Sequence, residues 1–153
     1  MDTFFEDYLQ RLTDLHNDFK EAIDGLPQAA LDWTPGEDMN SLCVLVVHVC
    51  GAERYWVGDV AMGESSDRDR AIEFTAEGLS LAALNGKLDA SEAYIRKSLA
   101  QLTVRDLAES RKVPGRDRKF TVGWVLLHTL EHTGLHLGHA QITRQMWATT
   151  LKS

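Results

Sequence analysis

The chain has 153 residues, of which 44% are hydrophobic and 25% charged, and its formal net charge is −7. This length suits one domain over residues 1–153 with its own apolar core, and the composition is that of a globular protein. An acidic chain without a Lys/Arg cluster is not expected to bind nucleic acid, and no apolar run approaches the ~20 residues of a membrane span. The N-terminus has no signal-peptide pattern, and Cys43 and Cys50 are too far apart in one predicted helix for a disulfide, so we expect a cytoplasmic protein.

Two helices are predicted in the first 63 residues. Apolar side chains recur every three or four positions in the first helix, at Phe5, Leu9, Leu12, Leu15, Phe19, Ile23 and Leu26. This helix ends near residues 25–27, where a turn-rich connection begins. Asn40 or Ser41 can cap the second helix, residues 41–63. Because its first half is apolar on nearly every side, we expect more than one of its faces to be buried.

Two further helices are predicted in the rest of the chain. Residues 63–70 form a polar loop, and the pattern of residues 74–80 fits either an extended connector or a helical turn. A third helix follows over residues 80–102, and residues 104–119 form a charged connection. Thr121 caps the last helix, which continues to about residue 149. Four long helices with connections of this length predict an all-α fold, an antiparallel four-helix bundle.

The last helix contains an unusual group of histidines. His128, His132 and His136 follow one another at a spacing of four and form a slanting stripe, with His139 close beside it. Two imidazoles four residues apart can bind one metal ion from the same helix face. A third ligand must come from another element, because one straight helix cannot surround an ion.

The remaining histidines are His16 and His48. His48 lies among valines in the second helix, where a buried ring needs a polar partner, and a metal ion would be such a partner. A hydrogen-bonded core histidine is the alternative interpretation. His16 stands beside Asp14 and Asp18, and we interpret it as a solvated surface residue.

Four segments carry a family resemblance. They are residues 32–36 (DWTPG), 40–48 (NSLCVLVVH), 52–56 (AERYW) and 121–138 (TVGWVLLHTLEHTGLHLG). Together they resemble the DinB-like superfamily, and most closely its branch with mycothiol-dependent and bacillithiol-related transferases. The resemblance spans essentially the whole chain. It implies an antiparallel four-helix bundle that is commonly dimeric.

The resemblance also implies a metal site. The ligands would be His48, His132 and His136, with His128 as a companion outside the ligand set. The family often has the sequence HRGQ from the last ligand onward, whereas this chain has HLGH, with Leu137 and His139 in place of the basic residue and the amide. If those groups orient a substrate in the family, that role is missing or differently filled here.

Three imidazole ligands would leave an open position on a divalent metal ion, Zn²⁺ in the first place and Ni, Mn or Fe as alternatives. The ion could lower the pKa of a bound water, or bind a low-molecular-weight thiol that attacks a small electrophile. Candidate residues for orientation or proton transfer are Glu53, Tyr55, Glu131 and His139, each of which can also be read as ordinary surface charge or core. Two function classes stay open: a metal-dependent enzyme for thiol transfer, isomerisation or hydrolysis, and a bundle that binds a metal or small ligand without turnover.

The last helix further predicts a homodimer. Its apolar residues cover too much of its circumference for one core to bury. On one side are Leu127, Leu130 and Leu137; Val125, Leu135, Ile142 and Met146 flank the histidine stripe. An exposed apolar face of this extent usually marks an interface.

Overall fold

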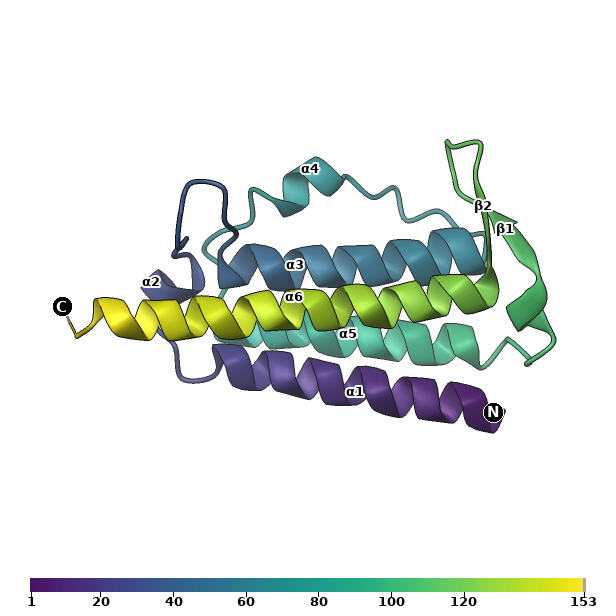
Figure 1. Cartoon of the computed structure of the whole chain (residues 1–153), viewed down its shortest axis with the longest axis horizontal. Coiled ribbons are helices and arrows are strands. Elements are labelled where there is room, and N and C mark those ends of the chain that lie inside the picture. Colours follow the sequence, from purple (N-terminus) through teal and green to yellow (C-terminus); the bar gives the residue numbers. More distant parts are fainter. Residues whose placement is uncertain (153) are drawn as a thin grey trace.

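Four long helices form a bundle in the computed structural model, which describes residues 1–152 (Figure 1). They are α1 (Thr3–Ile23), α3 (Leu42–Glu53), α5 (Leu81–Leu99) and α6 (Val122–Thr150). A π-helical segment, η1 (Arg54–Ala61), continues α3. Two predicted caps are confirmed, since Ser41 Oγ accepts from Val44 N and Thr121 Oγ1 from Trp124 N, each at 3.1 Å. The predicted all-α four-helix bundle is confirmed.

The direction of the helices depends on one long connection. In Figure 1, α1 and α6 run one way and α3 and α5 run the opposite way. Residues 62–80, here called the strap, return along α3 from the end of η1 to the start of α5, so α5 is parallel to α3 and antiparallel to α1. The strap contains the short helix α4 (Arg70–Glu73). The backbone N–H groups of Ala71 and Ile72 in its first turn donate to the Asp69 side chain. The strap therefore lays polar residues from the middle of the chain against α3.

Smaller elements fill the other connections. Helix α2 (Gln28–Leu31) lies between α1 and α3, and the 3₁₀ turn η2 (Asp106–Ala108) precedes a hairpin of β1 (Ser110–Lys112) and β2 (Lys119–Thr121). The strands are antiparallel, with Arg111 opposite Phe120. We predicted only a charged connection over residues 104–119. Strands of three residues are too short for alternation to be visible in the sequence, and the turn between them uses Gly115 at φ 69°.

The core consists of two apolar clusters, one toward each end of the bundle. One is built from the C-terminal half of α1, the first half of α3, the start of α5 and the second half of α6. The other joins the start of α1, η1, the end of α5 and the start of α6. None of the helices in the described part of the chain is both long and apolar enough to span a membrane.

Candidate metal centre

Three histidines from two helices converge at one point of the bundle. His48 comes from α3, and His132 and His136 come from successive turns of α6. One ring nitrogen from each of the three lies within 4.8 Å of the others. The Nε2 atoms of His132 and His136 are 3.2 Å apart, and the His48 ring centroid lies 5.1 Å from that of His132 and 5.0 Å from that of His136. The helical spacing of four aligns the α6 pair, and the packing of α3 on α6 brings His48 to it.

The electrostatic environment keeps these imidazoles neutral. Burial and, after it, the neighbouring imidazoles lower the pKa of His132 to about 3. Burial and His48 lower the pKa of His136 to about 4. The pKa of His48 is also lowered, because burial outweighs the opposing effect of Glu73. Neutral imidazole is the form that binds a metal ion, so no proton has to be displaced from these rings near neutral pH.

A carboxylate on the strap holds His48 from behind. Glu73 Oε2 lies 2.8 Å from His48 Nδ1, and Arg68 donates to both oxygens of Glu73, at 2.5 and 2.7 Å. A hydrogen bond from Nδ1–H to this carboxylate leaves the lone pair on Nε2, as it does in metal-binding histidines whose other ring nitrogen donates to a carboxylate. The carboxylate lies directly over Gly51, where a Cβ atom would collide with it. Gly51 thus permits the contact between strap and helix.

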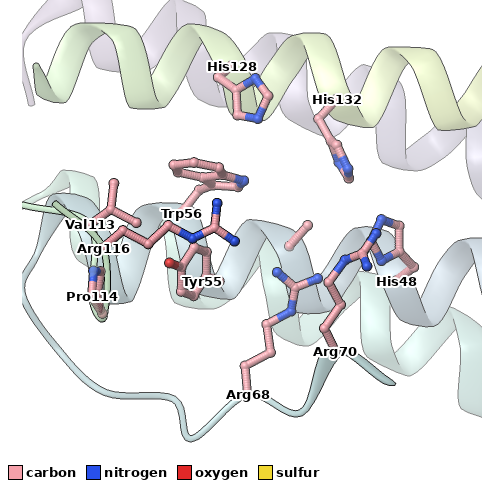
Figure 2. A pocket seen from close by; sticks show the side chains of 11 residues that line it. His48, Tyr55, Trp56, Arg68, Arg70, Val113, Pro114, Arg116, His128 and His132 are labelled. Atoms are coloured by element: carbon pink, nitrogen blue, oxygen red, sulfur yellow. The ribbon is translucent and has the colours of Figure 1, made fainter. Parts of the chain in front are cut away.

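A cavity of about 400 Å³ opens beside the histidines (Figure 2). His48 and His132 are in its wall, together with Tyr55, Trp56 and His128. The wall is completed by Ala52, Arg68, Arg70, Val113, Pro114 and Arg116. The His128 ring is held between aromatic rings, since its centroid lies 4.7 Å from that of Trp56 and 4.8 Å from that of Trp124, with which it is stacked. His128 therefore lies outside the three-histidine cluster and forms an aromatic side of the cavity.

The four residues considered for orientation or proton transfer take different positions. Tyr55 lines the cavity. The Glu131 side chain is 81% exposed, and its nearest ionic contact is His128 Nδ1 at 3.6 Å. His139 is exposed, with Nδ1 at 3.4 Å from His136 Nδ1. Neither Glu131 nor His139 contributes to the cavity wall.

Glu53, the fourth candidate, is fully buried in the bundle. Its carboxylate lies 3.0 and 3.1 Å from His16 Nε2 and accepts from Ser91 Oγ at 2.5 Å and from Thr133 Oγ1 at 2.8 Å. The interpretation of His16 as a solvated surface residue is wrong, because its exposed fraction is 1%. The charged neighbours were misleading. The usable signal was the position of His16 four residues after Leu12 and three before Phe19, on the apolar stripe.

Several residues around the site have no signal in the sequence. Glu73, Arg68 and Arg70 belong to the strap, and Arg116 belongs to the hairpin turn. Charged residues in polar loops are usually solvated. Only the path of the strap and of the hairpin over the bundle brings them to the histidines.

Solved structures with the same fold have low sequence identity to this chain. A DinB-like protein from Bacillus cereus is 15% identical with a TM-score of 0.75, and the match covers 94% of this chain and 92% of that one. YfiT from Bacillus subtilis, described as a probable metal-dependent hydrolase with an unusual four-helix bundle topology, is 15% identical (TM-score 0.60, 97% and 90% covered). A mutant of a mycothiol-dependent maleylpyruvate isomerase is 14% identical (TM-score 0.65, 88% and 59% covered). These likenesses concern the fold.

Sequence comparison gives the family. No curated protein matches the chain. The family model described as mycothiol-S-transferase matches residues 7–148. A match over nearly the whole chain, on a fold shared with DinB-like structures, confirms the resemblance inferred from the sequence motifs. The chain belongs to the mycothiol-S-transferase family, and its fold is that of a protein described as DinB-like.

Proposed function

We propose that this protein is a divalent-metal-dependent transferase in which a low-molecular-weight thiol reacts with a small electrophile. His48, His132 and His136 would hold the metal, with Zn²⁺ as first choice and Ni, Mn or Fe as alternatives. The observation that carries the proposal is the convergence of three neutral imidazoles, two of which, His48 and His132, line a cavity, with His48 hydrogen-bonded to Glu73.

The three residues fit such an ion. Bonds of ~2.1 Å at tetrahedral angles separate two ligand atoms by roughly 3.4 Å. The Nε2 atoms of His132 and His136, at 3.2 Å, are close to this separation. Two neutral imidazoles at this distance share at most one proton between them, so a bound cation would satisfy both lone pairs. A metal site with three protein ligands and a cavity on one side is typically catalytic, whereas a structural site usually has four protein ligands.

Each group around the cavity has a part in this proposal. A divalent metal, when bound, would act as a Lewis acid that lowers the pKa of a thiol or water. Glu73 keeps the His48 tautomer that presents Nε2, and Arg68 holds Glu73 in place. Trp56 and His128 form an aromatic side of the cavity against which a substrate can pack. Tyr55 is the candidate retained for proton transfer, since it alone of the four lines the cavity.

A metal-dependent hydrolase is the second candidate. The same open site would serve water as well as a thiol, and YfiT is described as a probable metal-dependent hydrolase. A bundle that binds a metal or ligand without turnover is the third. We also propose a cytoplasmic location, because Cys43 and Cys50 are free thiols.

Metal analysis of single variants tests the ligand set. We expect about one zinc per chain in the wild type and almost none in His132→Ala. His128→Ala and His139→Ala are matched controls on the same helix and should keep the wild-type stoichiometry. Equal loss in all three variants would show that the ligands are assigned wrongly. A screen of thiols with small electrophiles, run with and without zinc, then separates transferase from hydrolase and from a binding protein.

A further inference from the structure

Three arginines line this cavity, although the protein as a whole is acidic. Arg68 and Arg70 reach it from the strap and Arg116 from the turn between β1 and β2, while the chain as a whole has a net charge of −7. Figure 2 shows the three side chains extending into the space beside His128 and His132. Within the described residues, no Asp or Glu belongs to the cavity wall. The cavity is therefore positive in an otherwise negative molecule.

Two of these positive charges have no protein counter-ion. Arg68 is neutralised by its two contacts with Glu73. Arg70 and Arg116 form no ion pair with any residue of the described part of the chain; Arg70 instead lies 4.8 Å from the centre of the Phe74 ring. Arg54, Arg96 and Arg111 are paired with carboxylates, whereas Arg11, Arg105, Arg118 and Arg144 also have no carboxylate partner among the described residues. Arg70 and Arg116 differ from these four because both lie in the cavity wall. Two unpaired guanidinium groups from separate segments, both at one cavity, indicate an anionic ligand.

The size and surroundings of the cavity restrict that ligand. A volume of about 400 Å³ suits a small molecule. The negative net charge disfavours an extended polyanion, since the rest of the surface would repel it. A guanidinium fork matches a carboxylate in a bidentate contact.

We propose that the molecule on which this site acts carries a carboxylate, and that Arg70 and Arg116 bind it beside the three histidines. The statement that this molecule reacts at the site rests on the proposed function, whereas the binding of a carboxylate by Arg70 and Arg116 does not. The carboxylate belongs to the electrophile or to the thiol.

Calorimetry with a small dicarboxylate tests the proposal. Succinate should bind the protein, and the neutral, similarly shaped succinamide should bind at least tenfold more weakly. Arg70→Gln and Arg116→Gln should each weaken succinate binding about tenfold, because each removes a charge-assisted hydrogen bond. Arg118→Gln is the matched control: it removes the same charge from the same hairpin, but Arg118 lies over the Phe120 ring and not in the cavity wall.

Both metal-free and zinc-loaded protein should be titrated, so that a carboxylate bound by zinc alone is recognised. Equal binding of succinate and succinamide, or equal weakening by Arg118→Gln, would overturn the proposal. A comparison of 3-mercaptopropionate with 2-mercaptoethanol shows which reactant carries the carboxylate. Tighter binding of 3-mercaptopropionate that depends on Arg70 and Arg116 places the carboxylate on the thiol. Arginine-dependent binding of succinate without this difference between the two thiols places it on the electrophile. Loss of zinc binding would contradict the proposed function and leave the succinate result interpretable in metal-free protein.

Discussion

At the scale of single residues, the contact between His48 and Glu73 fits both an oriented metal ligand and a hydrogen-bonded core histidine. A buried histidine needs only one hydrogen bond, and Glu73 supplies it at 2.8 Å. That bond also leaves Nε2 without a proton, and one ring nitrogen from each of His48, His132 and His136 lies within 4.8 Å of the others. Glu73 is 7% exposed and reaches His48 only because Gly51 has no side chain. In the proposed metal site, Glu73 and Gly51 would thus orient His48 without binding the metal themselves.

We predict that Glu73→Gln and Gly51→Ala both weaken zinc binding by roughly 10- to 100-fold, the range found when a hydrogen-bond partner of a metal-binding side chain is lost. The first removes the negative charge beside His48, and the second pushes the carboxylate away. Competition with a chromophoric chelator measures the affinity. Glu77→Gln, an exposed change in the same strap, should have the wild-type affinity. Unchanged affinity in Glu73→Gln would mean that this hydrogen bond only satisfies a buried ring.

At the scale of the helices, a buried polar layer joins all four. His16 from α1, Glu53 from α3, Ser91 from α5 and Thr133 from α6 meet between the two apolar clusters. Glu53 accepts every one of these contacts, so its partners can be satisfied only when the helices have the correct rotation and height. Thr133 follows His132 directly. The layer therefore also sets which face of α6 points toward His48.

Removal of this carboxylate should be costly. We predict that Glu53→Ala lowers the free energy of unfolding by about 3 kcal/mol or more, because His16 is left buried without its partner. Urea denaturation measures the loss. Glu131→Ala, on an exposed side chain, should change stability by less than about 0.5 kcal/mol. The double variant His16→Ala/Glu53→Ala should lose less than the sum of the single losses; strict additivity would argue against the layer.

At the scale of the whole molecule, the apolar circumference of α6 is only partly covered. Val125 and Leu137 are buried in the bundle, with exposed fractions of 0% and 6%. Four apolar side chains of the same helix remain outside: Leu127 64%, Leu135 58%, Ile142 52% and Met146 36%. They lie within about a third of the helix circumference, next to the histidine stripe. A second copy of the chain would cover these four side chains, and we propose a homodimer in which they form the interface.

Sedimentation tests the assembly. We expect a dimer at tens of micromolar, with a buried area of ~1,200 Å² or more in total. Leu127→Glu combined with Leu135→Glu should give a helical monomer, because two charges would be buried at the interface. Leu151→Glu changes another exposed apolar residue, one just beyond α6, and should leave the dimer intact. A wild-type protein that sediments as a monomer would refute the interface.

Local patterns in the sequence were enough to predict the helices and the α6 part of the site. Apolar residues at spacings of three and four mark the buried stripe of α1, and Ser41 and Thr121 begin their helices as the cap pattern predicts. His132 and His136 face the same way because one turn of helix separates them. These features depend on interactions within a few residues, which the order of residues alone specifies.

Only the tertiary structure decided what lies around those histidines. The partners that matter are distant in sequence: Glu73 is 25 residues from His48, Glu53 is 37 from His16, and Thr133 is 80 from Glu53. The strap that carries Glu73 and Arg70, and the hairpin that carries Arg116, have polar sequences without a helical or strand period. Their positions are set by how they pack on the bundle. The sequence by itself therefore determined the helices and the aligned histidine pair, whereas the oriented His48, the buried His16 and the positive cavity result from long-range packing, which no local period encodes.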